Sequence, residues 1–241
     1  WQLSEVDDIG FLSNLIDYLG SEYNIDLNRI YSTGFSNGGY MSYTLACQLS
    51  EKIAAIASVT GSMYINQPLF CNPEHPIPVM QIHGTMDLTV PYIGSLNSES
   101  IDDVISYWVS FNECSQNFSF LTLPDINTFD SCYAEHYVYS NGNNGSSVEL
   151  YKVINGGHTW PGAYIPLAGI NTNQDFSASE KIWQFFSKYD LNGLIETTNI
   201  NEENKEIIII DSYNILGKKN PKKGFYIEIY NDGTTIKKYK L

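Results

Sequence analysis

The chain is short of positive charge and has no long hydrophobic segment. Its 241 residues contain 13 Lys and Arg against 27 Asp and Glu, which gives a formal net charge of −14. A protein this acidic repels the phosphate backbone, so a nucleic-acid partner is not expected. No run of 18 or more apolar residues occurs, so no membrane span is expected either.

The histidines and cysteines are not spaced for a metal. The sequence has no C-x-x-C pair and no H-x-x-x-H motif, and zinc sites need such closely spaced ligands. We expect no metal and no cofactor. An even number of cysteines favours two disulfides in an exported protein, with buried thiols as the alternative. Pairing Cys47 with Cys71 and Cys114 with Cys132 would close two local loops.

The chain has the composition of a globular domain, followed by a region with a different balance of charged residues. Hydrophobic residues make up 43% of the chain and aromatic residues 14%, which excludes general disorder. Residues 1–190 contain 5 basic and 20 acidic side chains, whereas residues 191–241 contain 8 and 7. We predict a domain at 1–190, a linker at 191–205 and a small β-rich module at 206–241. The start at Trp1, without a basic or apolar leader, indicates a cut into a longer protein.

Hydrophobic periodicity predicts alternating strands and helices in the first domain. Apolar residues at steps of three and four indicate helices, and short apolar runs indicate buried strands. This alternation predicts an α/β fold with a parallel sheet flanked by helices. The predicted strands are 29–33, 53–59, 78–83 and 148–154, and the predicted helices are 5–20, 38–49, 101–111 and 177–189.

The region after residue 205 has a different pattern. Three short segments rich in β-forming residues follow one another, and Asn231-Asp-Gly233 is typical of a hairpin turn. The predicted strands are 207–211, 224–230 and 234–241. We therefore expect a separate small β structure at this end.

A serine lies between two glycines where a predicted strand meets a predicted helix. Gly34-Phe-Ser36-Asn-Gly38 fits the pattern G-x-S-x-G of a nucleophile elbow. A strand that turns sharply into a helix leaves no room for Cβ atoms two residues on either side, and it pushes the serine hydroxyl clear of the sheet. A structural Gly-Ser turn is the alternative interpretation.

An acid and a base follow later strands in the order that such a serine requires. Asp87 follows the strand ending at His83, and His158 follows the strand ending at Ile154. Sites in open α/β sheets lie at these carboxyl ends, and a serine needs a base held by a carboxylate. Asp87 could instead be a turn residue, and His158 a solvated loop residue. His83 is the competing base, although its position favours a structural hydrogen bond.

Four stretches together resemble one branch of the α/β-hydrolases. Residues 29–42, 46–61, 78–92 and 156–162 resemble the polyhydroxybutyrate-depolymerase-like and feruloyl-esterase-like enzymes of carbohydrate esterase family 1, over about residues 6–189. The resemblance implies an α/β-hydrolase fold and hydrolysis of carboxylic esters. It implies a disulfide between Cys47 and Cys71. It also implies Ser36 as the nucleophile, Asp87 as the acid and His158 as the base. The backbone N–H of Asn37 would bind the oxyanion, and Trp160 would be the aromatic ring beside the site.

Two departures from the family pattern affect these expectations. Members of the family carry further strands before the first helix and a His-Gly loop that supplies a second oxyanion donor, so we expect an N-terminally incomplete hydrolase here. Losing one such donor costs on the order of 10² to 10³ in rate. The last 35 or so residues resemble a C-terminal sorting domain of the type IX secretion system, which implies secretion machinery as a partner.

The sequence therefore predicts a secreted serine esterase acting through an acyl-enzyme. Its substrates would be a polyester, or hydroxycinnamoyl or acetyl esters of plant polysaccharides, in polysaccharide degradation. A secreted polysaccharide- or polymer-binding protein that keeps the fold without catalysis is one alternative. A prolyl-oligopeptidase-type peptidase is another, although the motifs around Asp87 and His158 argue against it.

Overall fold

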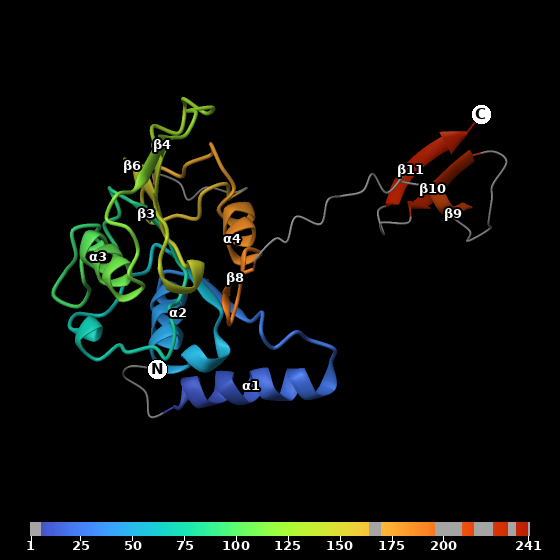
Figure 1. The fold of residues 1–241 in the computed structure, drawn as a ribbon. Coiled ribbons are helices and arrows are strands. Elements are labelled where there is room, and N and C mark those ends of the chain that lie inside the picture. The colour runs from blue at the N-terminus through green and yellow to red at the C-terminus, as the bar shows by residue number, and fades with distance from the viewer. Residues whose placement is uncertain (1–5, 164–169, 196–208, 215–223, 231–234, 241) are drawn as a thin grey trace. The chain divides into compact units, whose positions relative to one another are not determined.

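A computed structural model describes residues 6–163, 170–195, 209–214, 224–230 and 235–240. The chain forms two compact units, Trp1–Ile195 and Glu196–Leu241 (Figure 1). Within the described ranges, no helix has both the length and the apolar character needed to cross a bilayer.

The first unit is built on a six-stranded mixed sheet. Its strand order is β1-β2-β3-β6-β5-β4, with β1, β2, β3 and β6 parallel and the last two strands antiparallel to their neighbours. Every residue of β2 and β3 is buried, because helices cover both faces of the parallel part. The strands are β1 Tyr31–Phe35, β2 Ala55–Val59, β3 Val79–Gly84, β4 Ser119–Thr122, β5 Tyr133–Tyr139 and β6 Val148–Ile154.

Helices lie on both sides of this sheet. Helices α2 and α3 pack on one face with strand residues such as Ile56, and α4 packs on the other face with residues such as Ala57. Figure 1 shows α3 and α4 on opposite sides of β3 and β6. Successive strand residues serve opposite faces, which gives two hydrophobic cores. The helices are α1 Asp8–Glu22, α2 Asn37–Gln48, α3 Ile101–Phe111 and α4 Ala178–Phe186, and the short 3-10 helices are Ser50–Lys52, Gln67–Leu69 and Asn143–Gly145.

The sheet differs from the expected parallel one at its far edge. Strands β4 and β5 form an antiparallel pair inside the stretch 112–147, where the sequence predicts neither a strand nor a helix. Their side chains are exposed or half-buried, with only one buried residue between them. Because such strands need no continuous apolar run, the sequence pattern that revealed the buried strands is missing here.

One of the two predicted disulfides is present. Cys47 and Cys71 are bonded, as expected. The predicted pairing of Cys114 with Cys132 is wrong, because both are free and buried. Cys114 belongs to the core on the α3 face, whereas Cys132 belongs to the core on the α4 face. The sheet separates the two thiols, which excludes a bond between them.

The first unit continues beyond the predicted boundary at residue 190. Strands β7 (Tyr189–Asp190) and β8 (Gly193–Leu194) form a small antiparallel pair. The Leu191 N–H donates to the Asn28 carbonyl at 2.9 Å. The first residues of the predicted linker are therefore part of the first unit, and the remainder of the linker, 196–205, lies outside the described residues.

The second unit is a three-stranded antiparallel sheet with the order β11-β10-β9. Its strands are β9 Ile209–Asn214, β10 Gly224–Tyr230 and β11 Thr235–Lys240. They correspond to the three strands that the sequence predicts. The predicted turn at 231–233 lies outside the described residues.

Candidate active site

Ser36 occupies a strained turn between β1 and α2. Its backbone has φ 55° and ψ −112°, a conformation that non-glycine residues rarely adopt and that clusters at functional sites. The Ser36 N–H donates to the Val59 carbonyl at 2.8 Å, and its own carbonyl accepts from Gly39 and Tyr40 at 2.9 and 3.2 Å. These bonds tie the turn to β2 on one side and to the helix on the other.

Close backbone packing explains the glycines around this turn, but not in the way that the motif suggests. A Cβ on Gly34 would lie 2.6 Å from the Gly38 Cα, whereas a Cβ on Gly38 would meet nothing within 4 Å. Gly39 is the second crowded position, since its Cβ would lie 2.5 Å from the Ser58 Oγ and 2.9 Å from the Gly61 Cα. The expectation that both motif glycines relieve crowding is therefore correct for Gly34 and wrong for Gly38.

Asp87 lies in the loop after β3 with its carboxylate buried. Oδ1 accepts the backbone N–H groups of Thr89 and Val90 at 2.9 and 2.8 Å, and Oδ2 is 2.8 Å from Nδ1 of His158. The residue is 3% exposed. Three hydrogen-bond donors therefore hold this carboxylate in place, as expected for an acid that orients a base.

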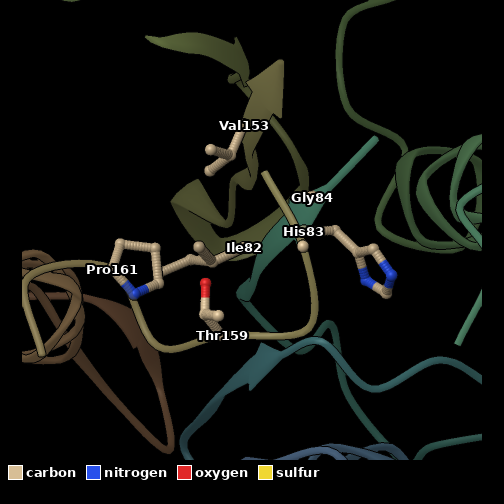
Figure 2. A pocket seen from close by; sticks show the side chains of 7 residues that line it. Ile82, His83, Gly84, Val153, Thr159 and Pro161 are labelled. Carbon is tan, nitrogen blue, oxygen red and sulfur yellow. The ribbon is translucent and has the colours of Figure 1, made fainter. Parts of the chain in front are cut away.

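His158 lies in a glycine-rich loop that rests on the end of β3. A Cβ on Gly84 would overlap the backbone of Gly156, so the two chain segments approach as closely as glycine permits. The Met86 N–H also donates to the Gly156 carbonyl at 2.9 Å. Figure 2 shows the hollow between the end of β3 and this loop, and it has no room for a water molecule.

The ends of β1, β3 and β6 meet at one edge of the sheet. The ring of Phe35, the residue before Ser36, contacts the His158 ring with centroids 4.8 Å apart. The structure thus brings the turn of Ser36, the Asp87 carboxylate and the His158 imidazole together. In the part of the chain that is described, no group of three or more His, Cys, Asp and Glu side chains could hold a metal ion.

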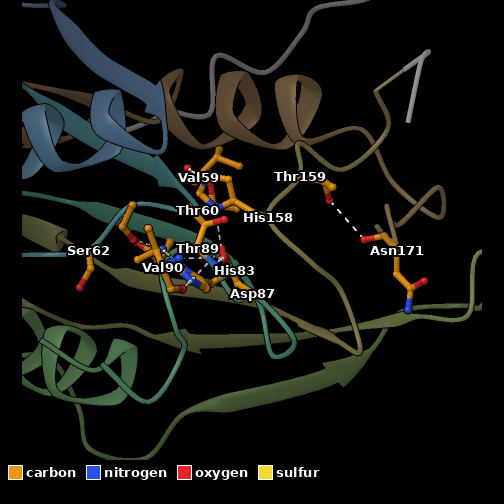
Figure 3. A network of polar contacts seen from close by, with 12 residues as sticks. Val59, Thr60, Ser62, His83, Asp87, Thr89, Val90, His158, Thr159 and Asn171 are labelled. Carbon is orange, nitrogen blue, oxygen red and sulfur yellow. Dashed lines mark hydrogen bonds and ion pairs between the residues drawn. The ribbon is translucent and has the colours of Figure 1, made fainter. Parts of the chain in front are cut away.

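His83 is a second histidine near the same carboxylate, and it is buried. Its Nε2 lies 2.8 Å from the Val90 carbonyl and 3.4 Å from Oδ2 of Asp87, and its Nδ1 accepts from the Gln81 amide at 2.9 Å. Figure 3 shows His83 and His158 in one network around Asp87. Burial lowers the pKa of His83, which therefore stays neutral. Its role is structural, in agreement with the structural hydrogen bond that its position in the sequence favours.

Gln81 extends this network into the core and was missed by sequence reasoning. Its amide also donates to the Gly61 carbonyl at 2.9 Å, and its Oε1 accepts from the Tyr43 hydroxyl at 2.6 Å. The three side chains that are hydrogen-bonded in this row, Tyr43, Gln81 and His83, are fully buried. A polar residue in the otherwise apolar stretch 77–82 is the signal that could have revealed it.

Asn37 and Trp160 occupy different surroundings. Asn37 is the first residue of α2, so its N–H is one of the first-turn amides that have no partner within the helix. The Trp160 indole N–H donates to the Ser179 Oγ at 3.2 Å, and its ring packs partly against the α4 core. Asn37 is thus placed at the start of α2, whereas Trp160 makes its contacts with α4.

Comparison with known proteins defines the class. Residues 6–116 match the family model described as Phospholipase/Carboxylesterase. This match covers a little under half of the chain and, together with the sheet flanked by helices, supports an esterase-like α/β-hydrolase.

Named relatives are esterases of longer chain. Feruloyl esterase B of Piromyces equi is 31% identical over 64% of this chain and 29% of its own. Feruloyl esterase D of Neurospora crassa is 26% identical over 79% and 58% of the two chains. The bifunctional acetylxylan esterase/xylanase XynS20E of Neocallimastix patriciarum is 26% identical over 82% and 26%. This chain therefore spans less than two thirds of each of these relatives.

A solved structure also matches part of this chain. The acetyl xylan esterase from Aspergillus awamori superimposes with a TM-score of 0.48 and 14% identity, over 74% of this chain and 66% of that one.

Proposed function

We propose that the chain hydrolyses carboxylic esters through Ser36, His158 and Asp87. The observation that carries this proposal is the hydrogen bond between Nδ1 of His158 and Oδ2 of Asp87, at the sheet edge where Ser36 stands in its strained turn. In the neutral tautomer whose Nδ1 donates to this carboxylate, Nε2 carries no proton and can act as a base.

The geometry supports a two-step acyl transfer. Ser36 Oγ attacks the ester carbonyl carbon while Nε2 of His158 takes the hydroxyl proton. The Asn37 N–H, at the start of α2, stabilises the oxyanion. Collapse of the tetrahedral intermediate breaks the bond to the alcohol, which leaves with the proton from His158. Water then attacks the acyl-enzyme by the same route, releasing the acid and restoring Ser36.

The substrate classes that we propose are polyesters and the hydroxycinnamoyl or acetyl esters of plant polysaccharides. The relatives named feruloyl esterase and acetylxylan esterase support the second class. Export is part of the proposal, because a disulfide such as Cys47–Cys71 persists in oxidising compartments. The second unit would then be the part that the secretion machinery recognises.

The test is hydrolysis of p-nitrophenyl acetate, p-nitrophenyl butyrate and methyl ferulate by the purified protein and its Ser36→Ala variant. We expect Ser36→Ala to lower kcat/KM on the order of 10⁴-fold or more, with unchanged urea unfolding. A folded wild-type protein that turns over none of these esters would contradict the proposal. Polymer binding by such a protein would indicate the binding role instead.

A further inference from the structure

The loop that carries Asp87 turns two apolar side chains outward. Asp87 is 3% exposed, but its neighbours Met86 and Leu88 are 57% and 88% exposed. Because Asp87 must point inward to reach His158, the residues on either side point away from the core. Large apolar side chains exposed together in this way are typical of ligand-binding surfaces.

These two side chains line a cavity beside His158. The cavity has a volume of about 250 Å³, and Ile170 adds a third apolar wall. The other side chains along it, Thr89, Asn155 and Asn171, are polar but uncharged, so among the described residues that line it His158 is the one ionisable group.

The far wall of the cavity is anchored to the loop of the base. The Asn171 side-chain amide donates to the Asn155 carbonyl at 3.0 Å, and the Asn171 carbonyl accepts from the Gly157 N–H at 2.9 Å. Ile170 packs so closely on Gly157 that a Cβ there would overlap its side chain. The cavity is thus formed by hydrogen-bonded and packed residues next to the imidazole.

The position of the cavity indicates which half of an ester it receives. In acyl transfer, the base hands its proton to the leaving oxygen, so the alcohol must lie against His158 when the acyl-enzyme forms. A space of about 150 Å³ accommodates benzene, so this cavity has room for a somewhat larger group. Apolar walls without a charge favour an alkyl or aryl group over a sugar or an ion.

We propose that the cavity lined by Met86, Leu88 and Ile170 is the subsite for an uncharged alkyl or aryl alcohol of the ester. This inference rests on the proposed function, because it uses His158 as the base. It narrows that function, because among the proposed substrates it favours a polyester, whose alcohol half is an alkyl chain, over an ester of a sugar.

The first experiment varies the alcohol while keeping one acid. Methyl acetate, benzyl acetate, an acetylated xylose and the negatively charged 4-(acetoxymethyl)benzoate share the same acyl-enzyme, so differences in kcat/KM report the alcohol. For the wild-type protein we expect benzyl acetate to exceed the other three by about tenfold or more. In Met86→Ala/Leu88→Ala, the ratio of benzyl to methyl acetate should fall by about tenfold.

A matched control and a gain-of-function variant complete the test. Leu121 lies on β4, the last strand of the sheet, and is 59% exposed, close to the 57% of Met86. Leu121→Ala therefore removes a comparable apolar side chain that does not line the cavity, and it should leave the ratio unchanged. Leu88→Lys should raise kcat/KM for the charged benzoate ester relative to benzyl acetate, because it places a positive charge on the wall.

The outcomes separate this inference from the function on which it rests. Hydrolysis that depends on Ser36 but shows the same benzyl to methyl ratio in all variants would overturn the subsite alone. Methyl butyrate and methyl hexanoate differ only in the length of the acyl chain. If the variants change only the ratio of kcat/KM between these two esters, the cavity receives the acyl group, and the proposed alcohol subsite is again overturned. Absence of any ester hydrolysis would contradict the proposed function itself.

Discussion

The turn after β1 and the turn after β3 lie at the same sheet edge, but different forces hold them. Around Ser36, backbone packs on backbone, since Gly34 and Gly39 allow segments to meet where a Cβ would not fit. Around Asp87, hydrogen bonds hold the loop, through its own carboxylate and through His83. The first turn therefore depends on the absence of side chains, and the second on their presence and protonation.

The largest effect is expected from breaking the backbone contact. In Gly34→Ala the new methyl group would lie 2.6 Å from the Gly38 Cα, and neither main-chain segment can move without shifting a strand or a helix. We expect a loss of about 4 kcal/mol or more in the free energy of unfolding, or no folded protein. Urea unfolding measures this, and a variant as stable as the wild type would show that the turn can open.

The next effect comes from breaking the hydrogen-bonded turn. His83→Phe leaves the Val90 carbonyl and one Gln81 N–H without the partners that His83 gives them, and each lost partner costs about 1–3 kcal/mol. We expect about 2–4 kcal/mol of destabilisation together with a lower kcat. His83→Gln can restore part of these bonds and should recover part of both quantities. Equal stability of the Phe variant would contradict the role of His83.

A smaller effect is expected from pH. Burial depresses the pKa of His83 below its ordinary 6.5, despite the opposing charge of Asp87. As the pH falls, His83 therefore takes up a proton in the unfolded chain at a higher pH than in the folded protein. Stability is then retained above pH 6.5 and lost as the pH falls from there toward the depressed pKa, with a slope of up to about 1.4 kcal/mol per pH unit. Urea unfolding between pH 7 and 5 should show this slope, and His83→Gln should lack it.

The smallest effect is expected at the other motif glycine. Gly38→Ala adds a methyl group with no neighbour within 4 Å, in the first turn of a helix where alanine is the better residue. We predict unchanged ester hydrolysis and a change of about 0.5 kcal/mol or less, toward higher stability. A loss comparable to that of Gly34→Ala would show that the two glycines are equivalent after all.

The sequence predicts those parts of the molecule that leave a local pattern. Apolar runs reveal β2, β3 and β6, and the serine between Gly34 and Gly38 marks the turn. Strands β4 and β5 leave no such pattern, because exposed side chains carry no apolar period. The crowding at Gly39 depends on Gly61, far along the chain, and the bond from Tyr43 to Gln81 joins a helix to a strand. Such long-range contacts require the fold.

The separation of Cys114 from Cys132 by the sheet has a consequence for recovering the protein after denaturation. An unfolded, reduced chain presents four equivalent thiols, and most of their pairings are wrong. Only the assembled sheet shields two of them and leaves Cys47 beside Cys71. Refolding in a glutathione mixture that allows exchange should therefore give a higher yield than air oxidation, in which early mispaired bonds become traps.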